Sequence, residues 1–250
     1  MRPPFRLPLG GSPVSMGTVT PTCVVRREAV GIDARKYLAL SVVMFLEYAI
    51  WGAWAPVLAA RLLGPLEMTG EQTGWIYATL PLACIFAPFL AGWIADRWLN
   101  AEWILIVAHL IGAVLLFQAA RIERFEPLLG VMFAYSLCYA ATLPLVNSVL
   151  FAGTADIGDD AVRGGTQAKV FIWAPVAWAL VGWGLTGWRM LRGTTGDGSD
   201  CLYLASALSL VMVAGSILVA VVSPTRPAGG KAFPIKKVMK KLSEANFLVF

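Results

Sequence analysis

The chain has 250 residues, of which 58% are hydrophobic and only 14% are charged, and its formal net charge is +5. A water-soluble domain carries about a quarter of its residues as charged ones, so this composition excludes the ordinary soluble class. The positive charges fall mainly in the segments between long apolar runs, so they relate to membrane topology, and no nucleic-acid partner is expected.

Residues 1–36 are rich in Pro, Gly and Arg without apolar periodicity, which predicts a disordered N-terminal segment. The apolar stretch 37–60 predicts the first membrane-spanning helix and is interrupted only by Glu47, near its middle. An ionisable group at that depth costs ~2.5–3.5 kcal/mol and normally faces a cavity or a partner. Burial favours the neutral form of a carboxyl, so Glu47 is a candidate cavity acid and proton carrier; the alternative is a hydrogen-bonded packing residue. Trp51 and Trp54 share its helix face as candidate cavity walls.

Two charge-free runs follow, at 72–95 and 103–120, and each predicts a helix that crosses the bilayer. In the turn between them, Gly92, Asp96 and Arg97 resemble the Gly-x-x-x-Asp-Arg/Lys turn of major facilitator proteins, which latches one conformation. Ordinary interfacial charges are the alternative. His109 lies near the middle of the second run and is a candidate for proton coupling or for an interhelical hydrogen bond.

The remaining predicted spans are 127–151, 170–188 and 202–222. Tyr139 and Thr142 lie on one face of the first of these, and Asn147 adds an amide, so the three are candidates for binding a solute. In the next span Trp173 is an aromatic candidate. The alternative for these polar groups is hydrogen bonding to neighbouring helices.

Residues 223–244 predict a basic cytoplasmic linker, and 245–250 predict the start of a truncated seventh helix, so we expect the chain to be a fragment of a longer transporter. With the N-terminus inside, 15 of the 20 Lys and Arg residues fall on the inner side, which predicts a multi-pass protein with a cytoplasmic N-terminus. The expected fold is all-α and integral to the membrane: six transmembrane helices forming the N-terminal half of a major facilitator transporter. No phosphate-binding loop, metal-spaced cluster or nucleophile motif is present, so neither an enzyme activity nor a cofactor or metal is expected.

Three strings resemble the bacterial nucleoside:proton symporter family. Phe45–Trp54 (FLEYAIWGAW) is similar to its Phe-Leu-Gln-Phe-x-x-Trp-Gly-x-Trp opening, and Ala95–Trp103 (ADRWLNAEW) is similar to its Ala-Asp-Lys-Trp-Leu-x-Ala-x-Trp turn. Thr142–Asn147 (TLPLVN) resembles its Thr-Leu-x-Leu-x-Asn. The resemblance implies twelve helices in two halves, with a C-terminal half as partner, and uptake of nucleosides with protons across the cytoplasmic membrane by alternating access.

Two positions depart from that family. Glu47 stands where the family has Gln, and Phe171 stands where the family has an Arg that binds nucleoside. The departure at Phe171 favours a major facilitator transporter of another solute, such as a sugar or a drug. A non-transporting six-helix membrane protein is the remaining alternative.

Overall fold

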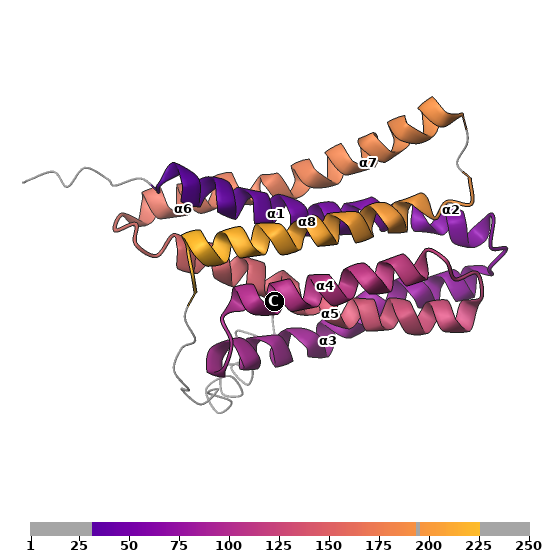
Figure 1. The fold of residues 1–250 in the computed structure, drawn as a ribbon, viewed down its shortest axis with the longest axis horizontal. Coiled ribbons are helices and arrows are strands. Elements are labelled where there is room, and N and C mark those ends of the chain that lie inside the picture. Colours follow the sequence, from indigo (N-terminus) through magenta and orange to yellow (C-terminus); the bar gives the residue numbers. More distant parts are fainter. Residues whose placement is uncertain (1–31, 194–195, 226–250) are drawn as a thin grey trace, which may run out of the picture.

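A computed structural model describes residues 32–193 and 196–225, and within these ranges the only regular structure is helical. The helices are α1 (Ala34–Trp54), α2 (Leu58–Leu63), α3 (Gly70–Arg97), α4 (Ala101–Ala119), α5 (Phe125–Gly153), α6 (Asp160–Phe171), α7 (Trp173–Arg192) and α8 (Asp200–Val222). They run side by side along one long axis, and α7 diverges from α8 toward its C-terminal end (Figure 1). The predicted disordered segment (apart from its last five residues), most of the predicted linker and the predicted seventh helix lie outside the described residues.

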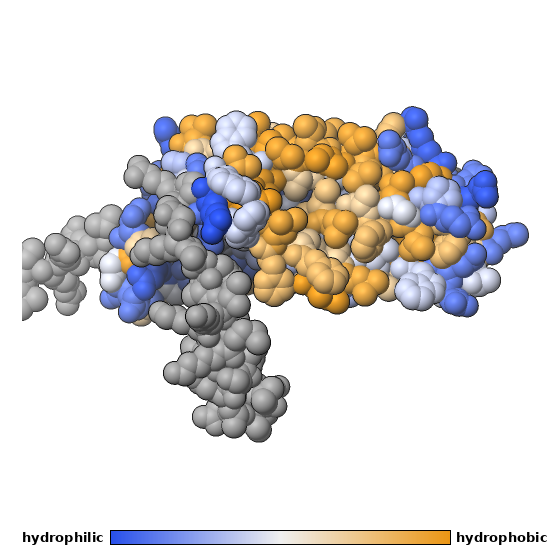
Figure 2. All heavy atoms as spheres, turned by 90° about the horizontal axis from the view of Figure 1, so that it is seen from below, coloured by the Kyte–Doolittle hydropathy of each residue, from blue (hydrophilic) through white to orange (hydrophobic). Residues whose placement is uncertain are grey.

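Within the described residues, six stretches are long and apolar enough to cross a membrane, which confirms the expected all-α, six-helix membrane fold. They are Ala34–Leu63, Gly70–Arg97, Ala101–Ala119, Phe125–Gly153, Asp160–Arg192 and Asp200–Val222. A hydrophobic band crosses the middle of the molecule between two hydrophilic ends (Figure 2). The chain is therefore a multi-pass membrane protein.

Prolines explain where two of the spans break. Pro56 lies between α1 and α2, and Pro175 lies in the first turn of α7, just after the break at Ile172. Proline lacks a backbone N–H and its ring collides with the carbonyl four residues earlier, so a continuous helix cannot pass without a kink. The fifth span begins at Asp160 and not near residue 170, because α6 is a polar helix whose N-terminus is capped by Asp159.

The helices pack in a series in which α1, α8, α4 and α5 each contact the next, with α7 against α1 and α3 against α5. The main contacts join α3 with α5, α4 with both α5 and α8, and α1 with α7 and α8. The two ends of the bundle are named here for their buried charged residues. Helices α1, α4 and α6 begin at the Glu102 end, and α3, α5 and α8 begin at the Arg61 end.

Candidate functional site

Glu47 lies wholly inside the bundle, where α1, α4 and α5 meet. It is 0% exposed, and its Oε2 lies 3.0 Å from Nε2 of His109 on α4. Its Oε1 accepts a hydrogen bond of 2.7 Å from the hydroxyl of Thr142 on α5. The hydroxyl of Tyr139, also on α5, donates to the backbone carbonyl of Glu47 at 2.6 Å. These four residues form what we call the Glu47 cluster.

The hydroxyl of Thr142 faces two acceptors. Its Oγ1 lies 2.7 Å from Oε1 of Glu47 and 2.7 Å from the backbone carbonyl oxygen of Tyr139. A hydroxyl carries one proton and two lone pairs, so it donates to only one of these oxygens at a time. The cluster thus contains one hydroxyl with a choice of acceptor.

A ladder of aromatic rings runs from the Glu47 cluster toward the Arg61 end. Tyr139 stacks on Tyr135, with ring centroids 5.7 Å apart and an interplanar angle of 24°. Tyr135 meets Trp54 edge to face at 6.0 Å, and its hydroxyl accepts a 3.2 Å hydrogen bond from Nε1 of Trp54. Trp54 also forms part of the wall of a pocket, so the ladder connects the buried cluster to that pocket.

The pocket has a volume of about 360 Å³ and is lined mainly by aromatic and aliphatic side chains of α1, α3, α5 and α7. Trp51 and Trp178 meet edge to face at 5.4 Å on one side of it. The Tyr77 hydroxyl is held by Ala59 N–H at 3.0 Å and donates to the Ala55 carbonyl at 2.7 Å. Both size and lining fall within the range of small-molecule sites.

Gly52 brings α7 against α1 beside this pocket. A Cβ atom placed at Gly52 would lie 3.0 Å from Cα of Trp178, which is tighter than most real Cβ contacts. The two backbones therefore meet without a side chain between them, and this close approach seats Trp178 over Trp51.

Of the predicted cavity residues, Trp51 and Trp54 line the pocket, whereas Glu47, Tyr139 and Thr142 lie together in the buried cluster. Asn147 is half-buried further along α5, and its side-chain oxygen is buried without a hydrogen-bond partner. Trp173 lies apart from the pocket, against Phe45 at 6.3 Å, and lines a separate hollow with Lys169. The structure therefore brings the predicted residues together in two groups and leaves Asn147 and Trp173 outside both.

The predicted latch lies at the Glu102 end of α3. Asp96 and Arg97 are both exposed, and the Arg97 guanidinium lies over the ring of Trp93 at 5.4 Å. Within the residues that the structure describes, Asp96 forms no ion pair. A Cβ at Gly92 would meet nothing within 4 Å, so this face of α3 is open.

Sequence reasoning missed Glu102, a carboxylate that is 0% exposed at the start of α4. It accepts hydrogen bonds from the Thr225 backbone N–H at 2.6 Å and from the Thr225 hydroxyl at 2.7 Å. The same hydroxyl accepts from the N–H of Ala101 at 3.1 Å. These bonds fasten the residues just after α8 to the turn that carries the predicted latch.

Arg61, which sequence reasoning placed in an ordinary loop, is 1% exposed at the opposite end. Its guanidinium donates to the Asp197 carboxylate at 2.9 Å and to the carbonyl of Ala120 at 2.9 Å. Gly198, at φ +72°, lies against the Arg61 side chain, where a Cβ would come within 3.0 Å. The Ser199 hydroxyl first, and then Arg61, hold the pKa of Asp197 below its usual value. No sequence pattern could have indicated this pairing, because the partners are distant in the chain.

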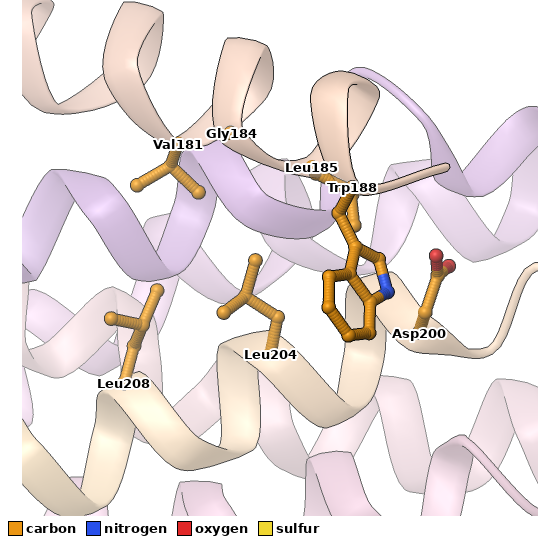
Figure 3. A pocket seen from close by; sticks show the side chains of 7 residues that line it. All are labelled: Val181, Gly184, Leu185, Trp188, Asp200, Leu204 and Leu208. Atoms are coloured by element: carbon orange, nitrogen blue, oxygen red, sulfur yellow. The ribbon is translucent and has the colours of Figure 1, made fainter. Parts of the chain in front are cut away.

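An apolar groove of about 360 Å³ runs between α7 and α8 (Figure 3). Its walls include Val181, Leu204 and Leu208, with Trp188 near one end. Asp200 lies at that end too, but its carboxylate is already bound by Arg189 at 2.9 and 2.5 Å. The groove therefore lacks the convergent polar groups of a solute site. Within the described ranges, no cluster of three His, Cys, Asp or Glu side chains could hold a metal ion.

Comparisons with known proteins agree with this architecture. The model of a family described as nucleoside H+ symporter matches residues 35–250. The nucleoside permease NupG of Escherichia coli K12 is 34% identical over 125 residues, which is 50% of this chain and 30% of the permease. The xanthosine permease of the same organism is 34% identical over 134 residues, 54% of this chain and 32% of that protein.

A solved structure shows the same fold. A crystal structure of a point mutant of the nucleoside transporter NupG superposes with a TM-score of 0.71 at 27% identity, covering 86% of this chain and 53% of that one. The matched regions thus span about a third of the curated relatives and about half of the solved transporter. The match of the family model to residues 35–250 establishes that the chain belongs to the nucleoside H+ symporter family.

Proposed function

We propose that this chain forms the N-terminal half of a transporter that takes up nucleosides together with protons by alternating access. The observation that carries the proposal is the pairing, in one bundle, of an aromatic pocket with a buried ionisable cluster, connected by the ladder of Tyr139, Tyr135 and Trp54.

The pocket suits the flat, partly polar ring of a nucleobase. Trp51, Trp54 and Trp178 supply aromatic surface, and aromatic rings stack well on other flat π-systems. The names of the matched permeases give nucleosides or xanthosine as their solutes. Both points support a nucleoside as the solute here.

Glu47 and His109 are the proposed proton-coupling residues. They bond one another at 3.0 Å in a site where neither is more than 3% exposed. Ionisable residues inside membrane proteins commonly serve as proton relays. A proton held in this cluster lies next to the ladder that ends at the pocket.

The transporter is placed in the cytoplasmic membrane with its N-terminus and the Glu102 end inside, as the distribution of Lys and Arg favours. The half-buried Gly92 and the exposed Asp96 and Arg97 are then free to engage a second half of the transporter, and we retain them as the proposed conformational latch. That second half would also supply the remaining walls of the pocket. The lipid bilayer would surround the apolar band of the molecule.

The test is uptake of labelled uridine by the protein as its gene encodes it, in a host that lacks nucleoside transport, with and without a protonophore. We expect uptake that collapses when the proton gradient is removed. Absence of uptake from protein shown to be in the membrane would contradict the assignment of nucleoside as the solute.

A second candidate is transport of another small solute, such as a sugar or a drug. Phe171, at the position of the family's nucleoside-binding Arg, packs against Phe151 at 6.3 Å and is not part of the pocket wall. A panel of labelled sugars and drugs in the same host separates this candidate from the first.

A further inference from the structure

The two acceptors of Thr142 match the two protonation states of Glu47. When Glu47 is ionised, the Thr142 hydroxyl donates to its Oε1, and a hydrogen bond to a charged acceptor is the stronger kind. When Oε1 carries a proton, that proton is donated to Oγ1 of Thr142, whose own proton then turns to the carbonyl of Tyr139. No acceptor or donor of the Glu47 side chain is left unbonded in either state.

His109 keeps its bond through the same change. In the tautomer that carries its proton on Nε2, His109 donates to Oε2 of Glu47 whether the imidazole is neutral or charged. The cluster therefore holds one proton, on either side chain, without acquiring a net charge. A buried site disfavours a net charge, so an arrangement without one suits this part of the bundle.

The surroundings of the cluster contain few competing charges. Tyr48 of α1 and Tyr135 and Tyr139 of α5 lie within electrostatic range of Glu47, and Cys84 of α3 lies near Tyr139. The charged and titratable residues of the other helices packed on α1 and α4 lie toward the ends of the bundle: Asp160, Arg163 and Lys169 of α6, Arg189 and Arg192 of α7, Asp200, Cys201 and Tyr203 of α8, and Glu102 of α4. His109 is thus the one described cationic group that bonds Glu47.

We propose that the Thr142 hydroxyl is a switch that follows the proton on Glu47, donating to the carboxylate when it is ionised and to the Tyr139 carbonyl when it is protonated. Thr142 acts through Glu47 and is a positioning residue. The switch rests on the proposed function and deepens it, since it gives the proton-coupled reaction a group that changes partner beside Tyr139, where the ladder to the pocket begins.

The test is a pH titration of the purified, gene-encoded protein by infrared difference spectroscopy, which detects the C=O stretch of a protonated carboxyl. Glu47→Gln assigns the band, because the amide keeps the shape and cannot titrate. Thr142→Val removes the hydroxyl and keeps the branched shape, whereas Thr142→Ser restores the hydroxyl. Thr142→Ala replaces the valine variant if that variant does not fold.

We expect the band assigned to Glu47 to disappear, in Thr142→Val, at a pH about one unit higher than in the wild type. A hydrogen bond to a charged acceptor is roughly twice as strong as one between neutral groups, so removing the hydroxyl destabilises the ionised form of Glu47 more than the protonated form. Thr142→Ser should titrate like the wild type. A band that Glu47→Gln does not remove, or equal midpoints in the valine and serine variants, would overturn the proposal.

Uridine uptake by the same variants separates this inference from the proposed function. If the midpoint shifts as expected but no variant or wild-type protein transports uridine, the switch stands and the solute is wrong. If uridine is transported and the midpoints do not move, the symporter stands and Thr142 is a packing residue.

Discussion

Two carboxylates, Glu47 and Glu102, are both 0% exposed, yet their hydrogen bonds differ in kind. The Thr225 hydroxyl beside Glu102 accepts from the N–H of Ala101 and donates to the carboxylate, so its proton has one orientation. The Thr142 hydroxyl beside Glu47 faces two acceptors and has two orientations. A buried carboxylate among fixed donors fastens parts of the chain together, whereas a neighbour with two orientations is what the proposed proton exchange at Glu47 requires.

The sharpest test of this comparison is Glu47→Gln. The amide preserves the size of the side chain but carries no exchangeable charge, so we expect proton-driven accumulation of the solute to be abolished while downhill exchange continues. Uptake into energised cells measures the accumulation, and exchange in de-energised cells measures the downhill movement of solute. Accumulation that persists unchanged would mean that Glu47, like Glu102, has only a structural role.

Glu102→Ala should act on stability. It leaves the Thr225 N–H and hydroxyl without their acceptor, and unsatisfied buried groups cost about 2–3 kcal/mol of unfolding free energy. Thermal unfolding in detergent should show a lower midpoint than for Glu47→Gln. Equal midpoints for the two variants would mean that the two carboxylates are alike in structural role.

Trp54→Phe breaks the step between the ladder and the pocket. Phenylalanine keeps a ring but loses the Nε1–H donated to Tyr135, which is worth about 1 kcal/mol, so we expect uridine affinity to fall about fivefold. Trp51→Phe is the matched control, since Trp51 lines the same pocket from the same helix. Isothermal titration with purified protein measures both, and identical affinities would show that the bond to Tyr135 does not matter to the pocket.

Asp197→Asn tests whether a third buried charged residue, Arg61, stabilises the fold through its ion pair with Asp197. The lowered pKa of Asp197 means that its ionised form favours the native state. This contribution to stability is complete at pH values above the ordinary pKa of an Asp side chain, about 4. It is lost as the pH falls through the lowered pKa that Asp197 has in the native state. Since the Asp197 side chain is 61% exposed, we expect a loss of at most about 1 kcal/mol, seen at neutral pH and absent in strong acid. A loss of the same size at both pH values would exclude the ionised carboxylate as its cause.

Much of the fold could be predicted because it depends on local features. Long apolar runs, five of them free of charged residues and the first interrupted only by Glu47, indicated all six spans. The largest error is at the fifth span, because the first turns of α6 are polar. The depth of Glu47 indicated its burial, because position along one helix is a local property. The positions of Trp51 and Trp54 on the pocket wall follow from the same helical spacing.

The partners of the buried charges could not be predicted, because they come from helices far apart in sequence. His109 is 62 residues from Glu47, and Thr225 is 123 residues from Glu102. Helical spacing shows which residues share a face, but the rotation of one helix against another decides which faces meet. For that reason the helical spacing of Tyr139 and Thr142 could place them on one face of α5 but could not show that this face meets Glu47.

Gly52 has a mechanical consequence for the pocket. With no side chain as a spacer, α1 and α7 bear directly on one another, so α7 can act as a lever whose fulcrum lies beside Trp51. Because the contact lies at Trp178 itself, a rocking of α7 by a few degrees would leave Trp178 nearly in place and move the two ends of α7. A methyl group added at position 52 would lie too close to the backbone of Trp178 and would force the two helices apart.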